Sequence, residues 1–120
     1  MRLGIIGSGD FENMERLAAI LSAQQEEDEA LVIVADEEDR LGQRALQWAA
    51  ENGIGHEAVL TNRKVVAMSD SVLAIVSADD ELAASRVGWA QSSGKPVEVV
   101  RLDQPPARKG RPAVKEEEEA

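Results

Sequence analysis

Residues 2–11 read RLGIIGSGDF, in which a short apolar run ends in two glycines separated by a serine. Gly7 and Gly9 permit a tight turn between a strand and the helical pattern that follows. Such a turn opens dinucleotide-binding domains, so this stretch predicts the first strand and helix of an α/β fold. The fingerprint is incomplete, because Glu12 stands where G-x-G-x-x-G has its third glycine.

Beyond this turn, apolar runs alternate with segments of helical periodicity. The expected strands lie at 2–6, 30–35, 55–60, 71–77 and 97–102, and the expected helices at 11–24, 39–52, 62–68 and 79–93, with 24–29 as a polar connection. This alternation predicts right-handed crossovers and a parallel sheet. We therefore expect a Rossmann-like three-layer α/β/α sandwich whose five parallel strands have the order 3-2-1-4-5.

The composition is that of one globular domain. The chain has 120 residues, of which 43% are hydrophobic. We expect residues 1–103 to form the domain and residues 104–120, rich in proline and charge, to be a disordered tail. The absence of cysteine excludes disulfides and thiolate catalysis, and a single histidine excludes multi-histidine metal sites. No apolar run is long enough to cross a bilayer, so a cytoplasmic protein is expected.

The charge of the chain bears on its partners. The net charge is −10, and all of it belongs to residues 1–103, because four basic residues balance four glutamates in the tail. Nucleic acids and anionic membranes need a basic surface. We therefore expect neither of them as a partner.

Several motifs occur in the same order as in the YspA-like branch of the SLOG superfamily of Rossmann-like nucleotide-binding domains. GIIGSGDF at 4–11 resembles the family's G-S-R-D-F opening, and QWAAENGI at 47–54 resembles the end of its second helix. TNRKVVAMSDSVLAIVS at 61–77 is similar to its R-N-x-x-M segment and the following strand, and ASRVGWAQSSGKPVEVV at 84–100 to its last helix and strand. The resemblance covers residues 1–101 and implies a nucleotide-binding crevice and self-association.

The departures from the family pattern concern phosphate binding. Gly9 and Thr61 stand where the family has arginines. The acidic stretches ADEEDRLG at 35–42 and SADDELA at 77–83 replace glycine-rich turns whose N–H groups would hold an anion. Carboxylates repel a phosphate at such close range. We therefore expect the fold to be kept and the phosphate site to be degraded.

From these features we expect non-catalytic binding of a nucleotide or nucleotide-derived small molecule with few phosphates. The site would lie between the first and fourth strands, where the strand order reverses. Its residues would be Gly7, Ser8, Gly9, Asp10, Phe11, Asn62 and Arg63. The cofactor stays unknown and no catalytic residue is assigned. One alternative is a ligand-free structural or protein-interaction module of bacterial or phage origin, and a less favoured one is a nucleotide N-glycosidase-type enzyme. A homodimer is compatible with the first two functions.

Three acidic residues, Asp10, Asp36 and Asp79, each follow a strand at the same edge of the expected sheet. Carboxylates there could hold Mg²⁺. Solvated N-terminal helix caps are the interpretation we favour, because aspartate is common at helix starts.

The aromatic residues and the histidine carry a weaker signal. Trp48 and Trp89 occupy helical positions that favour a core or interface role over base stacking, and His56 is expected at the surface.

Overall fold

The computed structural model describes residues 1–11 and 13–102. Its strands are β1 (Arg2–Gly7), β2 (Val32–Asp36), β3 (Gly55–Val59), β4 (Ser71–Val76) and β5 (Val97–Arg101). Its helices are α1 (Met14–Glu27), α2 (Arg40–Glu51), α3 (Asn62–Met68) and α4 (Glu81–Ser92). The tail expected at 104–120 lies outside the described residues.

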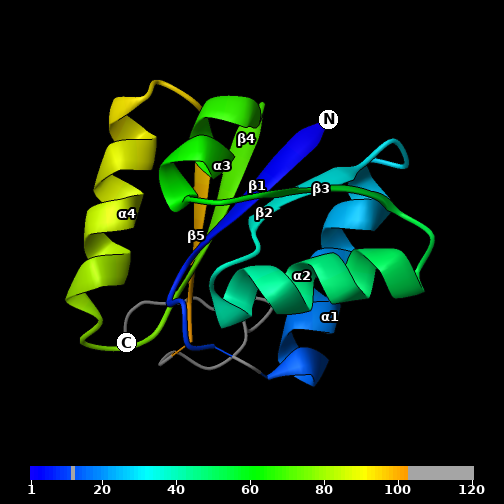
Figure 1. Cartoon of the computed structure of the whole chain (residues 1–120), viewed down its shortest axis with the longest axis horizontal. Coiled ribbons are helices and arrows are strands. Elements are labelled where there is room, and N and C mark those ends of the chain that lie inside the picture. The colour runs from blue at the N-terminus through cyan, green and yellow to red at the C-terminus, as the bar shows by residue number, and fades with distance from the viewer. Residues whose placement is uncertain (12, 103–120) are drawn as a thin grey trace, which may run out of the picture.

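The five strands form one parallel sheet in the order β3-β2-β1-β4-β5, which confirms the predicted Rossmann-like fold (Figure 1). Helices α1 and α2 cover one face of the sheet, and α3 and α4 cover the other. The order reverses at β1, whose neighbours are β2 and β4. A crevice between loops is therefore expected beyond the carboxyl ends of β1 and β4.

Each face of the sheet has its own buried cluster, because successive strand residues point to opposite faces. Leu3 and Ile5 of β1 belong to the cluster under α1 and α2, whereas Ile6 belongs to the one under α3 and α4. The first cluster also contains Leu17, Leu21, Leu41, Ala45 and Trp48, and the second contains Val34, Val65, Val72, Ala83 and Ala90. This burial holds the ends of the strands, and with them the loops of the crevice, in fixed positions.

The bounds of α1 and the start of α4 differ by two or three residues from the predicted ones. Helix α1 begins at Met14 rather than at residue 11, because the side chain of Asn13 accepts the Arg16 N–H at 3.0 Å and caps the helix. The helix then continues to Glu27, so most of the stretch predicted as a polar connection is helical. Helix α4 begins at Glu81 rather than at residue 79, since Asp80 is its cap.

The expectations for the tryptophans and the histidine hold in part. Trp48 is 4% exposed and lies in the core, and His56 is exposed. Trp89 is only half-buried. No helix in the described part of the chain combines the length and the apolar character that crossing a membrane requires.

Candidate functional site at the carboxyl edge of the sheet

The loop after β1 lies directly against the end of β4. Gly7 has φ +134°, and a Cβ at this position would be 2.0 Å from the carbonyl oxygen of Ile75, so only glycine allows this approach. The Ser8 N–H donates to the same Ile75 oxygen at 2.8 Å. The Ser8 hydroxyl accepts the Ser77 N–H at 2.8 Å. Ser8 is fully buried by these contacts, so it holds two loops together and is not exposed to a ligand.

The N-terminus of α2 is closed by the chain's own oxygens. The Gly9 carbonyl accepts the N–H groups of Arg40 and Leu41 at 2.8 and 3.2 Å, and the Asp39 carboxylate accepts the Gly42 N–H at 2.7 Å. The Gln43 N–H donates to the Asp39 carbonyl. The N–H groups of Arg40, Leu41 and Gly42, which a helix start leaves without an intrahelical partner and which bind phosphate in nucleotide-binding folds, are therefore already used.

The end of β2 contributes a buried carboxylate. Asp36 is 5% exposed, and one of its oxygens accepts the Glu38 N–H at 2.7 Å. A Cβ on Gly42 would lie 1.9 Å from the Asp36 carbonyl oxygen, so glycine lets α2 start directly against this strand end. Asp36 and Asp39 are thereby brought to the same side of the crevice.

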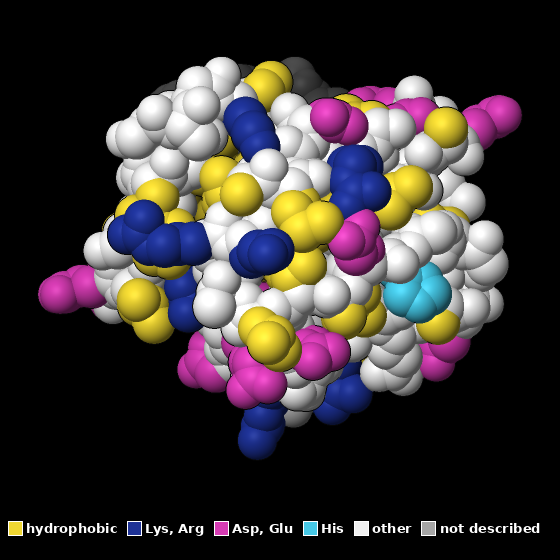
Figure 2. All heavy atoms as spheres, turned by 45° about the horizontal axis from the view of Figure 1, so that its top comes forward, with side chains coloured by type: hydrophobic (Ala, Val, Ile, Leu, Met, Phe, Trp, Pro, Cys, Tyr) yellow, Lys and Arg dark blue, Asp and Glu magenta, His cyan; other side chains and the backbone are white. Residues whose placement is uncertain are grey.

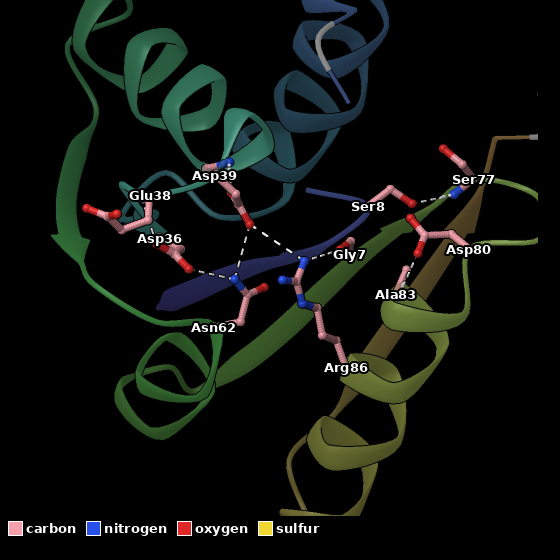
Figure 3. A network of polar contacts seen from close by, with 11 residues as sticks. Gly7, Ser8, Asp36, Glu38, Asp39, Asn62, Ser77, Asp80, Ala83 and Arg86 are labelled. Atoms are coloured by element: carbon pink, nitrogen blue, oxygen red, sulfur yellow. Dashed lines mark hydrogen bonds and ion pairs between the residues drawn. The ribbon is translucent and has the colours of Figure 1, made fainter. Parts of the chain in front are cut away.

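Asn62 joins these two carboxylates. It is the first residue of α3, which Thr61 caps, and its Nδ2 donates to Asp36 Oδ2 at 2.7 Å and to Asp39 Oδ2 at 3.1 Å (Figure 3). Both acceptors are carboxylates, so the nitrogen of the amide must face them. The Asn62 side-chain oxygen then points toward the opposite side of the crevice.

Arg86 reaches this side from α4. Its Nη1 donates to the Gly7 carbonyl at 2.7 Å and lies 3.7 Å from Asp39 Oδ2 (Figure 3). The side chains of Arg86 and Asp39 are only 15% and 16% exposed. We name Asp36, Asp39, Asn62 and Arg86 the crevice cluster; with both carboxylates ionised it carries one net negative charge.

The electrostatics of the crevice differ between its acidic residues. Burial raises the pKa of the Asp39 carboxyl, and the nearby Asp36 carboxylate adds to this, although the Gly42 N–H, the Asn62 amide and Arg86 act in the opposite direction. The pKa of Asp80 is lowered instead, first by the Ala83 N–H. Asp39 is therefore the carboxylate on which the structure imposes the larger cost of ionisation.

Two polar atoms of the crevice cluster have no partner. Within residues 1–11 and 13–102, the only buried side-chain nitrogen or oxygen atoms without a hydrogen bond are Asn62 Oδ1 and Arg86 Nε. The first is an acceptor and the second a donor. Figure 3 shows the two side chains turned toward one another across the crevice. Buried polar groups in native proteins are nearly always paired, so these two atoms are exceptions that require an explanation.

The remaining predicted ligand residues are dispersed. Asp10 is exposed, and Phe11 packs against the buried cluster under α1 and α2. Arg63 is exposed, and its guanidinium lies over the Trp89 ring, 4.5 Å from the centroid. The structure thus brings Gly7, Gly9 and Asn62 to the crevice cluster and directs the Asp10, Phe11 and Arg63 side chains elsewhere.

The three aspartates considered for metal have other surroundings. Asp10, Asp36 and Asp79 do not form a group that could hold a metal ion, and no such group of three occurs elsewhere in the described residues. Their interpretation as helix caps was wrong, because the caps are Asn13, Asp39, Thr61 and Asp80. Asp36 is buried rather than solvated, and Asp79 has a positive φ of 61°.

Two members of the crevice cluster, Asp39 and Arg86, were not predicted as site residues. A signal for Arg86 was present: it is the only basic residue in 79–93, three positions after Ala83 and four before Ala90. Both alanines are buried against the sheet, so helical spacing places Arg86 on the same side of α4.

A small hollow lies at the end of β4. Its volume is about 250 Å³, and it is lined by residues 76–81, Ala84 and Arg101.

Comparison with protein-family models, with curated proteins and with solved structures finds no match to this chain.

Proposed function

We propose that this chain binds a nucleoside-like small molecule, without catalysis, at the crevice between the ends of β1, β2 and β4. The observation that carries the proposal is the pair of buried atoms without partners, Asn62 Oδ1 and Arg86 Nε. They lie at the strand-order reversal, where ligands bind in sheets of this kind. We propose further that the chain is a member of the YspA-like branch of the SLOG superfamily, that it is cytoplasmic and that it forms a homodimer.

The chemistry of the crevice favours the nucleoside part of a nucleotide over its phosphates. The N–H groups at the start of α2 are already bonded, so they offer a phosphate no donor. The crevice cluster is negative overall and repels further negative charge. An acceptor and a donor without partners instead match the edge of a nucleobase, which carries both kinds of group.

A second candidate function is a ligand-free structural or protein-interaction module. It is supported by the contacts within the crevice cluster, since Asn62 and Arg86 together link α3 and α4 to the ends of β1 and β2. In that case the hydrogen bonds of the crevice cluster serve only to connect the loops, and the chain's own side chains fill the crevice.

A thermal-shift and calorimetric screen against uncharged nucleosides, AMP, NAD and ADP-ribose distinguishes the two. A nucleoside present at 100 times its Kd should stabilise the fold by about 2.7 kcal/mol. Arg86→Lys keeps the positive charge but removes Nε, and should weaken nucleoside binding about tenfold. Arg63→Lys makes the same exchange outside the crevice and should leave the Kd unchanged.

Each result has a definite meaning. No stabilisation by any compound would overturn the binding proposal in favour of the interaction module. If a compound stabilised Arg86→Lys and Arg63→Lys by the same amount, its binding site would lie outside the crevice. That result would also contradict the proposal. Circular dichroism of each variant establishes that a loss of binding is not a loss of fold.

A further inference from the structure

The outer surface between α3 and α4 contains a second, separate groove. Its volume is about 640 Å³, and its lining residues are Arg63, Ser85, Gly88, Trp89, Ser92 and Ser93. Figure 2 shows the face of the molecule that brings α3 and the end of α4 forward, where basic, acidic and hydrophobic side chains are mixed. Arg63 is the only charged residue among those that line the groove.

Arg63 is held in place at the rim of this groove. Its guanidinium lies 4.5 Å from the centroid of the Trp89 ring, a cation–π contact that limits the motion of a long side chain. The stacked face is covered, but the N–H groups lie in the plane of the guanidinium and remain free to donate. A guanidinium fixed in this way loses less entropy when it binds a ligand.

Arg63 has no carboxylate partner in the part of the chain that the structure describes. Lys95, a cation at the end of α3, is already used, because its Nζ donates to the carbonyls of Val66 and Ala67. Although the chain has 23 acidic residues, the N–H donors of Arg63 are thus available to a ligand.

The floor of the groove adds hydroxyl donors. Ser85, Gly88 and Ser92 follow one another at helical spacing along the exposed side of α4. A Cβ on Gly88 would have no atom within 4 Å, so the floor is open at its centre. Ser93 is committed to the Ala90 carbonyl, which leaves the hydroxyls of Ser85 and Ser92 to face a ligand.

We infer that this groove binds an oxyanion, the phosphate or carboxylate group of a small molecule. Arg63 supplies a planar pair of N–H donors, the geometry that matches such groups, and Ser85 and Ser92 supply further donors. The inference does not depend on the proposed nucleoside site, which uses Arg86 and lies at the edge of the sheet.

An NMR titration of the full chain with inorganic phosphate, and separately with acetate, tests this inference at constant ionic strength. The two tryptophans give two indole N–H signals, which Trp48→Phe assigns. The Trp89 signal should move saturably with at least one anion. The Trp48 signal should not, because Trp48 is buried on the other face of the sheet. The responding anion identifies the class of ligand.

Two variants with the same charge make the test specific. Arg63→Gln should weaken the anion about tenfold, since a charge-assisted pair is lost. Lys64→Gln removes one positive charge from the adjacent residue, which lines a different hollow with Leu60 and Met68, and should leave the affinity unchanged. A Trp89 signal that neither anion moves, or an equal loss in both variants, would overturn the inference.

Discussion

At the scale of single residues, glycine and aspartate have other tasks here than the sequence pattern predicts. Gly7 and Gly9 are the glycines of a phosphate-binding turn, yet Gly7 makes room for the Ile75 carbonyl and Gly9 accepts the first N–H groups of α2. The turn therefore serves the packing of β1, β4 and α2. Asn62, which the resemblance indicated, is the predicted site residue whose side chain has a buried atom without a hydrogen bond in the described part of the chain.

Gly7→Ala should destabilise the fold by about 3 kcal/mol or more, because the new Cβ would lie 2.0 Å from a backbone oxygen and φ is positive. Urea denaturation measures the change. Gly53→Ala is the matched control: φ is +68° but nothing lies within 4 Å of its Cβ position, so only about 1 kcal/mol is expected. Equal losses in the two variants would show that the close approach to Ile75 has no energetic weight.

Asp39→Asn tests the buried carboxylate through pH. The folded-state pKa of Asp39 is raised, so the native state holds the proton more tightly than the unfolded chain and loses stability as pH rises through that pKa. Asparagine does not ionise but can still accept the Gly42 N–H. The stability of Asp39→Asn relative to wild type should therefore increase from pH 3 to pH 7.

Thermal unfolding of both proteins across this pH range gives the comparison. The contacts of Asp39 with Asn62 and Arg86 lower its pKa and are already part of the net raised value, whereas the contacts that asparagine makes in their place do not change with pH. A difference between the two proteins that stays constant with pH, or that changes in the opposite direction, would contradict a raised pKa at Asp39.

At the scale of elements, the start of α4 shows why boundaries were misplaced. The sequence offers two aspartates in succession, and either could cap the helix. Asp80 takes this position because Asp79 adopts a positive φ, which turns the chain out of β4 one residue before the cap. At α1, likewise, the cap is Asn13, although Phe11 has the apolar character of a helix face. Local turn geometry, which periodicity does not report, decided both starts.

Asp80→Ala should cost about 1 kcal/mol at pH 7, the usual value for a lost N-cap. The pKa of Asp80 is lowered by the Ala83 N–H and the Ser8 hydroxyl, so the contribution of its charge is present at neutral pH and lost as pH falls through the folded pKa. The gap between variant and wild type should accordingly narrow in acid, as chemical denaturation at several pH values would measure.

Asp79→Gly is the matched change for this experiment. It removes the same charge one residue earlier, keeps the cap, and relieves a positive φ of 61°. It should leave stability unchanged or raise it by up to about 1 kcal/mol. If Asp79→Gly were the more damaging substitution, the assignment of Asp80 as the cap of α4 would be wrong.

At the scale of the whole molecule, the dominant feature is the excess of negative charge. The net charge is −10, because 23 acidic residues stand against 13 basic ones. Repulsion among so many carboxylates opposes a compact state.

The melting temperature should rise by a few degrees when sodium chloride is raised from about 0.01 M to about 0.15 M, because the screening length falls from about 30 Å to about 8 Å. Differential scanning calorimetry at both salt concentrations measures this. A melting temperature that fell with salt would mean that attractive pairs outweigh the repulsion.

The fold was predictable in its topology and in most of its elements. The segments at 30–35 and 71–77 are almost continuously apolar, as expected of strands whose two faces are both covered. Parallel sheets between two layers of helices have such strands. The candidate site was predictable only in part. Its position at the end of β1 follows from topology, and Asn62 from the resemblance, whereas Asp39 and Arg86 were not foreseen.

The sequence by itself determined the alternation of strands and helices, the parallel order and the acidic character of the loops, because periodicity, composition and charge are properties of neighbours along the chain. The tertiary structure alone decided which polar groups meet. Asp36, Asn62 and Arg86 come from three different elements, separated by 26 and 24 positions. They lie together only because the crossovers bring the end of β2, the start of α3 and the first half of α4 to one edge. Which donors and acceptors are satisfied, and which are left for a ligand, depends on distances between atoms far apart in the chain.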